Sequence, residues 1–371
     1  MNRMDNSLLD LILWAKSKGV QMEGVKAVKT AARGVCIVAT CKLKTGQRVM
    51  TVPTKAIHSL HSVPTSVSTK LPSGFPLHGL LAADLALKFR SNSPFWTTAL
   101  PTRADFAATM PLLWPEGLHS LFPIPAQDLL KKQQVKFQSE WDKVAGAFPE
   151  LSQLEYMYCW LIINTRTFYY TAPKMESFCW EDKLALLPAA DLFNHSDDGC
   201  QVSFSEDGYS ITANRPYRVG EELCISYGKH SNDFLLIEYG FVMSNNQWDE
   251  VALDEVIMPR LADDQKESLA KQGFLGEYKF HAKTGPCTRT CAAMAKIKER
   301  SYEGVICDGD VSGRRSGAVL GELLHELSIS ARDMLSRLSE SQIGDKLHRD
   351  LLIRRWTQIE HITKATSYSV E

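Results

Sequence analysis

The sequence has almost no excess of charge of either sign. Its 371 residues carry 42 Lys and Arg against 43 Asp and Glu, a net charge of −1. Proteins that bind nucleic acid usually have a basic surface, and electrostatic binding to membranes needs clustered cations. The total charge therefore predicts no nucleic-acid partner and no membrane partner, although a local basic patch can exist within a neutral total.

Long apolar runs and a cysteine framework are also missing. No run approaches the ~18 apolar residues of a membrane span. The apolar residues of 1–19 are interrupted by Asp5, Asp10 and Lys16, which does not fit a secretory signal. The nine cysteines are scattered and odd in number, unlike those of a small disulfide-stabilised secreted protein. We therefore expect an intracellular protein, either cytoplasmic or nuclear.

Common signatures of catalytic and metal sites are absent as well. The sequence contains no P-loop, no dinucleotide-binding glycine fingerprint, no HExxH and no GxSxG. Cys287 and Cys291 have the spacing of half a metal site, but no second Cys pair or His pair accompanies them. We expect no bound metal.

Apolar patterning divides the chain into four segments that together predict an α+β fold. Residues 1–75 contain β-branched runs separated by turn residues, which predicts strands. Residues 76–184 have apolar spacings of three and four interrupted by prolines, which predicts a helical insertion. Residues 185–245 return to short strands, and two apolar stripes in 246–371 predict packed helices. Within the insertion and after it, we expect helices over 78–90, 127–147 and 153–169, and strands over 184–188, 200–204, 210–213 and 223–225.

The most informative motifs lie between residues 187 and 241. Asn194-His195 follows an apolar segment, Gly220-Glu221-Glu222 precedes Ile225-Ser226-Tyr227-Gly228, and Tyr239-Gly240-Phe241 closes the region. In this order and at these spacings, the motifs resemble those of SET-domain methyltransferases. The helical insertion places the likeness in the branch that includes the Rubisco lysine methyltransferases and other lysine methyltransferases of non-histone proteins. Matches upstream, at 32–35 and at Thr165-Arg166-Thr167-Phe168, extend the resemblance over about residues 20–245.

The resemblance implies a SET fold of short β-sheets with a pseudo-knot-like C-terminal segment, a helical insertion and a C-terminal all-helical domain. It implies S-adenosylmethionine as the cofactor and Tyr227 as the catalytic residue. The cofactor-binding residues that it implies are Arg33, Gly34, Val35, Arg166, Asp191, Asn194, His195 and Tyr227. The acceptor would bind against Phe204, Tyr209, Tyr239 and Phe241.

These residue types suit the chemistry that the resemblance implies. Arg166 is a two-pronged donor for a carboxylate, and Gly34 lets main chain approach a ligand closely. A lysine acceptor must lose a proton, yet its pKa of ~10.4 leaves about one part in a thousand neutral near pH 7.4. Burial beside a fixed cation lowers that pKa. Holding the acceptor in line for displacement contributes about 7–11 kcal/mol, and the Tyr227 hydroxyl would orient it.

Three functions remain open at this point. The first is methylation of a lysine, or a histidine, in a non-histone protein by a monomeric enzyme. The second is a SET-like enzyme that acts on a small molecule, by methylation or by a cofactor-independent cyclisation. The third is a non-catalytic module that binds a partner through its C-terminal helices. Ala32 and Thr165 depart from the family's usual glycine and serine, and the C-terminal segment is short for a protein-binding domain.

Overall fold

The computed structural model describes residues 3–30, 34–90, 100–171, 179, 183–205, 207–301 and 312–367. Contacts divide the chain into two compact units, and each unit is assembled from two separate stretches of chain. The first unit comprises residues 1–106 and 132–229, and the second comprises 107–131 and 230–371. The four segments expected from patterning thus combine into two units, and residues 107–131 of the expected insertion belong to the second.

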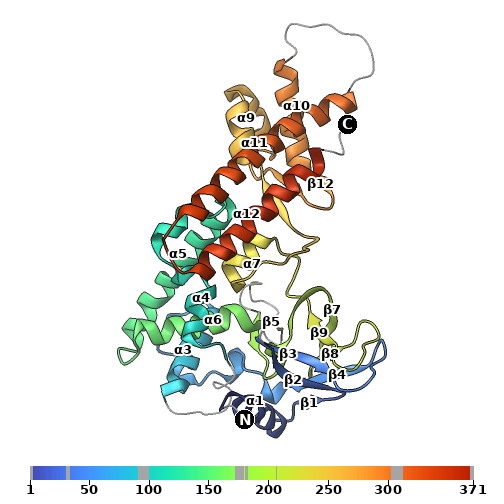
Figure 1. Cartoon of the computed structure of the whole chain (residues 1–371). Helices are drawn as coiled ribbons and strands as arrows, with labels where there is room; N and C mark the ends of the chain where they lie inside the picture. Colours follow the sequence, from blue (N-terminus) through green and yellow to red (C-terminus); the bar gives the residue numbers. More distant parts are fainter. Residues whose placement is uncertain are drawn as a thin grey trace. The chain divides into compact units, whose positions relative to one another are not determined.

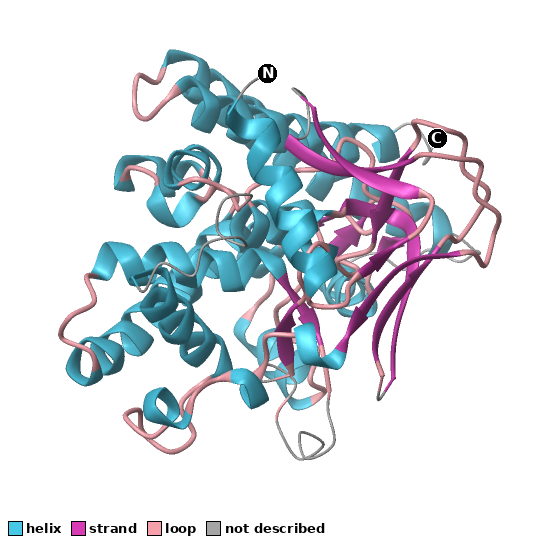
Figure 2. Cartoon of the chain, turned by 90° about the horizontal axis from the view of Figure 1, so that it is seen from below, coloured by secondary structure: helices cyan, strands magenta, loops and turns pink. Residues whose placement is uncertain are grey.

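A seven-stranded sheet lies in the described part of the first unit, in the order β1-β4-β8-β7-β9-β3-β2. Neighbouring strands are antiparallel, apart from β7 and β9, which are parallel. Figures 1 and 2 show these strands grouped together, and Figure 2 draws them in magenta. The strands are β1 (Gln21–Met22), β2 (Val25–Thr30), β3 (Gly34–Ala39), β4 (Arg48–Pro53), β7 (Asn194–Ser205), β8 (Gly208–Thr212) and β9 (Glu222–Ile225).

Two glycines allow the sheet to close up around β7. At the β7–β8 turn, Gly208 has φ 138°, and a Cβ there would lie 2.2 Å from the main-chain oxygen of Val52. In β7, a Cβ on Gly199 would lie 2.6 Å from Cα of Ile225 in β9. Both contacts are too short for any side chain, so only glycine permits these close backbone approaches. An Asp-Gly pair is a common hairpin turn, and Asp207-Gly208 has this position between β7 and β8.

Helices of the first unit pack through aromatic side chains. α6 (Gln153–Arg166) contacts α3 (Leu77–Arg90), and Tyr156 and Trp160 on α6 are fully buried. A capping box between Ser152 and Glu155 begins α6. The helix ends at Arg166, three residues earlier than expected, because the next three residues are extended and form strand β5. The remaining elements are α1 (Arg3–Ser17), α2 (Thr65–Ser68), β5 (Thr167–Tyr169) and β6 (Leu184–Leu186), and β5 pairs with β6.

The second unit is mainly helical, as expected for the C-terminal region, and it has one apolar core. That core joins residues 114–130 to the C-terminal helices through side chains such as Trp114, Leu324 and Trp356. The helices are α7 (Asn232–Tyr239), α8 (Asp254–Ile257), α9 (Asp263–Lys271), α10 (Thr288–Ser301), α11 (Ser312–Glu340) and α12 (Lys346–Ser367), and α4 (Arg103–Thr109) and α5 (Ile124–Ala147) contribute to both units.

A three-stranded sheet within the second unit was not expected. Strands β10 (Glu250–Ala252), β11 (Lys279–His281) and β12 (Gly285–Pro286) pair antiparallel. Strands of two or three residues are too short to show an alternating pattern, so this region looked entirely helical in the sequence. At the start of α12 Leu347 is 60% exposed, and the first buried apolar side chain of this helix is Leu352.

Within the described residues, no helix is both long enough and apolar enough to cross a membrane. The same residues contain no group of three or more His, Cys, Asp or Glu side chains that could hold a metal ion.

Candidate active site

Parallel pairing of β7 with β9 brings the main sequence motifs together. Asn194 lies opposite Cys224 and His195 lies opposite Ile225, two residues before Tyr227. Strand β9 also pairs with β3, which begins at Gly34. Residues from three distant parts of the sequence therefore meet at the same end of neighbouring strands.

The side-chain amide of Asn194 links the two strands that flank this end of the sheet. Its Nδ2 donates to the main-chain oxygen of Val35 in β3 (3.3 Å) and to Oε1 of Glu222 in β9 (2.9 Å). The expected neighbours Gly34 and Val35 are therefore beside Asn194, whereas Arg33 lies outside the described residues. Glu222 belongs to the Gly220-Glu221-Glu222 motif but was not among the expected site residues, and its contact with Asn194 gives it a specific position in the site.

His195 and Tyr227 fix one another. The main-chain N–H of Tyr227 donates to Nδ1 of His195 (3.0 Å), and the two rings stack with centroids 5.0 Å apart. Because Nδ1 accepts this bond, the neutral ring carries its proton on Nε2, which lies 3.8 Å from Oδ1 of Asp197. His195 is buried. This arrangement suits a residue that positions Tyr227 better than one that exchanges protons with substrate.

The hydroxyl of Tyr227 is oriented by the chain just before Asn194. It donates to the main-chain oxygen of Phe193 at 2.7 Å. A hydroxyl that donates its proton to one partner can still accept a hydrogen bond from another at its oxygen. Tyr227 can therefore accept a hydrogen bond from an amine or interact with a polarised methyl group. Sequence reasoning could not find the Phe193 partner, because every residue has a main-chain oxygen.

Arg166 and Asp191 form an ion pair within the candidate site. Nη1 of Arg166 donates to the main-chain oxygen of Asp191 (2.7 Å) and lies 3.5 Å from Oδ2 of the same residue. Nε of Arg166 is buried and has no hydrogen-bond partner within the described residues. An unsatisfied buried donor on a guanidinium is the kind of group that a ligand carboxylate satisfies.

A left-handed turn positions Asp191. Ala189 is fully buried and has φ 65°, a conformation that residues other than glycine rarely adopt. The short helical turn Ala190–Leu192 follows it and leads directly into β7. Backbone strain of this kind is common at functional sites, and here it lies five residues before Asn194.

Four aromatic residues of the first unit surround one another near β5. Phe204 and Tyr209 face each other across the β7–β8 hairpin, with ring centroids 5.9 Å apart. Phe168 and Tyr169 on β5 add an edge contact to Tyr209 (5.7 Å) and a tilted contact to Phe204 (6.0 Å). Sequence reasoning gave roles to Phe204 and Tyr209 but missed the other two. Phe168 was present in the quoted Thr-Arg-Thr-Phe motif, so a signal for it existed.

A hydrogen bond and burial keep Tyr209 protonated. Its hydroxyl donates to the main-chain oxygen of Tyr169 at 2.6 Å. Burial, and to a smaller extent the nearby Tyr169, raise the pKa of Tyr209 to about 12. The Tyr209 side chain is therefore uncharged at physiological pH.

Tyr239 and Phe241, the other two expected acceptor residues, belong to the second unit. Tyr239 is the last residue of α7, and its ring lies 6.3 Å from that of Phe241 and 6.4 Å from that of Phe234. Burial, and then the neighbouring Glu238, raise the pKa of Tyr239 to about 12. Their part in an acceptor channel with Tyr227 stays a prediction.

The sequence matches the family described as "SET domain" over residues 34–228, more than half of the chain. The chain belongs to the SET-domain family. This confirms the resemblance drawn from the motifs, and the match ends one residue after Tyr227.

Two curated relatives of this SET-domain chain are methyltransferases by name. "Ribosomal lysine N-methyltransferase set11" of Schizosaccharomyces pombe is 26% identical over 79% of this chain and 77% of its own length. "Actin-histidine N-methyltransferase" of Homo sapiens is 24% identical over 71% of this chain, which spans 47% of that relative. The solved "SET domain of LSMT bound to Lysine and AdoHcy" superposes with a TM-score of 0.60 at 16% identity, covering 100% of this chain and 93% of that one. The structural likeness confirms the expected fold.

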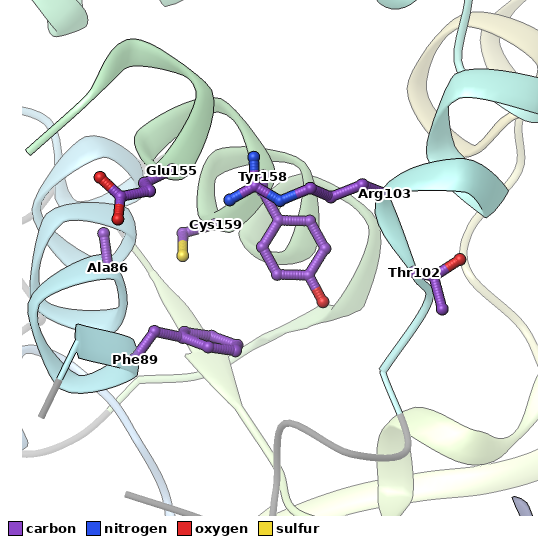
Figure 3. Close-up of a pocket in the computed structure, with 7 residues that line it drawn as sticks. All are labelled: Ala86, Phe89, Thr102, Arg103, Glu155, Tyr158 and Cys159. Carbon is purple, nitrogen blue, oxygen red and sulfur yellow. The ribbon is translucent and has the colours of Figure 1, made fainter. Parts of the chain in front are cut away.

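A separate cavity lies on the helical insertion of the SET-domain chain, away from these motifs. It has a volume of about 390 Å³ and is lined by residues of α3, α4 and α6 and by Thr102, as Figure 3 shows. The guanidinium of Arg103 lies over the ring of Tyr158, 5.2 Å from its centroid. None of the expected site residues lines this cavity, and Arg166 lies two turns farther along α6 than Tyr158.

Proposed function

We propose that this chain transfers a methyl group from S-adenosylmethionine to the side chain of a lysine, or of a histidine, in a non-histone protein. Membership of the SET-domain family and the names of the two relatives support this activity. The observation that carries it is the joining of Asn194, His195 and Tyr227 where β7 and β9 pair.

The residues of the first unit fit the cofactor's amino-acid end. The unsatisfied Nε of Arg166 suits its carboxylate, and the buried carboxylate of Asp191 suits its ammonium. Main chain at Gly34 and Val35, held by the Asn194 amide, offers polar groups to an adenine. When bound, S-adenosylmethionine supplies a methyl group on a sulfonium leaving group.

The acceptor then needs orientation and a neutral nitrogen. The proton of the Tyr227 hydroxyl is donated to the main-chain oxygen of Phe193, so the hydroxyl oxygen accepts a hydrogen bond from the acceptor amine. Phe168, Phe204 and Tyr209 provide apolar surface that excludes water, which lowers the pKa of a lysine placed there. The chain thereby contributes positioning and desolvation, and no metal is required.

Calorimetric titration with S-adenosylmethionine and with its demethylated product tests the cofactor site. We expect micromolar binding to the intact chain and at least a roughly tenfold loss in Asn194→Ala, because the Val35 and Glu222 contacts are removed together. Asn214→Ala is the matched control, since Asn214 lies on a turn outside the motifs, where its amide donates to Asp198 and accepts from Tyr217. Absence of binding to the intact chain would overturn the proposal.

Transfer of labelled methyl groups tests the chemistry. Tyr227→Phe should reduce transfer to protein by about 10²-fold or more while changing cofactor affinity less than about threefold, since the hydroxyl acts on the acceptor. Label that appears in a metabolite, with none in protein, would instead favour the small-molecule alternative.

We also propose that the enzyme is a monomer of the cytoplasm or nucleus. Relatives named for ribosomal and actin substrates support this location. Light scattering during gel filtration and imaging of a tagged chain test the two statements. A stable dimer, or a secreted protein, would contradict them.

A further inference from the structure

The neutral total charge conceals a strong segregation of charge along the chain. Residues 1–83 contain eleven Lys and Arg but only three Asp and Glu, a net charge of +8. The remaining residues therefore carry −9. Between residues 11 and 83 the only acidic residue is Glu23. An asymmetry of this size within one chain is typical of proteins that contact a polyanion.

Most of these cations follow one edge of the seven-stranded sheet. Strand β1 is an edge strand and pairs with β4, with Gln21 opposite Thr51. At one end, a Cβ on Gly19 would lie 3.2 Å from Cε of Lys55, which places Lys55 against the end of α1. At the other end, Gly24 lies against the turn that contains Leu43, with a Cβ contact of 2.7 Å. We call this surface the basic edge; its members are Lys16, Lys18, Lys42, Lys44, Arg48 and Lys55, whereas Lys26 lies on β2 at the opposite end of the strand order.

The charges of the basic edge are not neutralised locally. All six side chains are exposed, and within the described part of the chain none of them forms an ion pair. The adjacent turn carries two more arginines. Arg215 pairs with Glu221 at 2.6 Å, whereas Arg218 is exposed and adds its charge to the surface. In contrast, Lys271 on α9 has its own carboxylate, Glu267, at 2.7 Å. The basic edge thus presents a field that extends into solvent.

The composition of the edge decides which kind of polyanion fits. Stable protein interfaces have an apolar centre and are depleted in lysine. No large apolar side chain is exposed among the described residues from Lys16 to Lys55. Single-stranded nucleic acids bind on exposed aromatic rings, and the same residues expose none. Phosphates at regular spacing along a duplex need neither feature, only well-separated cations.

We propose that the basic edge binds the sugar–phosphate backbone of a nucleic-acid duplex. The expectation of no nucleic-acid partner came from the total charge, which averages this edge with the acidic remainder. Binding here is independent of sequence and does not rest on the proposed methyl transfer. The alternative is a purely structural role, in which lysines on an edge strand only prevent its pairing with strands of other chains.

Fluorescence anisotropy of the full chain with labelled RNA and DNA duplexes of about 20 base pairs tests the proposal, at about 50 and 200 mM salt. We expect binding that weakens steeply with salt. Lys42→Glu/Lys44→Glu should weaken it at least about tenfold and lower the slope of log affinity against log salt by about one to two. Lys131→Glu/Lys132→Glu, on exposed positions of α5, makes the same change in net charge and should weaken binding less than about threefold.

Several results would overturn the proposal. These are no binding at the lower salt, equal losses in the two double variants, or binding of poly-glutamate as tight as that of the duplex. Self-association of Lys42→Glu/Lys44→Glu with unchanged duplex binding would leave only the edge-protection role. Calorimetry with S-adenosylmethionine should give the same affinity in both variants, so failure here is distinguishable from failure of the proposed enzyme activity.

Discussion

Two arginine–aspartate pairs, one in each unit, are buried to different extents and satisfied to different extents. In the second unit Arg355 is fully buried and donates to both carboxylate oxygens of Asp233 (2.7 and 2.9 Å), to Asp249 (2.7 Å) and to the main-chain oxygen of Glu250. In the first unit Arg166 makes one hydrogen bond to the main chain of Asp191, and its Nε has no partner within the described residues.

The difference separates a structural arginine from one prepared for a ligand. Arg355 on α12 holds the first turn of α7, and Gln358 on the next turn of α12 bonds Asn232 beside it (2.9 Å). Every polar group in this network has a partner, so nothing remains for a ligand to satisfy. Arg166 keeps donor capacity at the end of its helix, and its side chain is 21% exposed. Unused hydrogen-bonding capacity, more than burial or charge, distinguishes the pair that we propose binds the cofactor.

The largest expected effect is on stability, from Arg355→Met. Removing the guanidinium leaves two carboxylates buried without a counter-charge, which should lower the free energy of unfolding by about 3–5 kcal/mol. Chemical denaturation of both proteins measures this change. Arg355→Met/Asp233→Leu/Asp249→Leu is the control, and it should recover much of the loss because no buried charge remains. A single variant within about 1 kcal/mol of the parent would contradict the structural role.

The second effect is on ligand affinity, from Arg166→Met. We expect affinity for S-adenosylmethionine to fall about ten- to hundredfold, the value of a charge-assisted hydrogen bond, with stability changed by less than about 1 kcal/mol. Calorimetry measures the first and thermal unfolding the second. Arg166→Lys should recover only part of the affinity, since a lysine is a point charge without a fork. Unchanged affinity in Arg166→Met would remove Arg166 from the site.

The smallest effect is on alkaline stability, from Tyr209→Phe. Loss of the bond to Tyr169 should cost about 1 kcal/mol near pH 8. The folded-state pKa of about 12 lies above the unfolded value near 10, so the unfolded chain releases a proton first as pH rises. Tyr209 therefore destabilises the fold by ~1.4 kcal/mol per pH unit between about pH 10 and 12. The parent's advantage of about 1 kcal/mol over the variant should shrink and then reverse in this window, as unfolding curves at several pH values would show. A constant difference would contradict it.

The sequence predicted the central residues of the candidate site better than the contacts that hold them in place. Asn194, His195 and Tyr227 were found because their side chains carry a recognisable motif. The contacts that hold them come from the main chain of Val35 and Phe193, and main-chain atoms leave no trace in the sequence. Glu222 was visible but uninformative until its pairing with Asn194 placed it.

Long-range grouping was also beyond the sequence. The helical pattern of 107–131 gives no sign that this stretch shares a core with the C-terminal helices, because periodicity reports one apolar face but not its partner. The end of α6 was predicted late for a local reason, since Thr167 and Phe168 suit either a helix or a strand until β6 pairs with them. Total charge has the same limit, because it discards position, so the expectation of no nucleic-acid partner stays a prediction.

The pairing of β3 with β9 has a consequence for synthesis on the ribosome. One side of β3 can be covered at once by β2, its hairpin partner, but the other side requires β9, which is translated nearly two hundred residues later. At about 5–20 residues per second, this interval is roughly 10–40 s. During that time the nascent chain exposes an unpaired strand edge that includes the buried residue Ile37. Because β3 waits for β9, we expect chaperones that shield strand edges to bind the newly made chain.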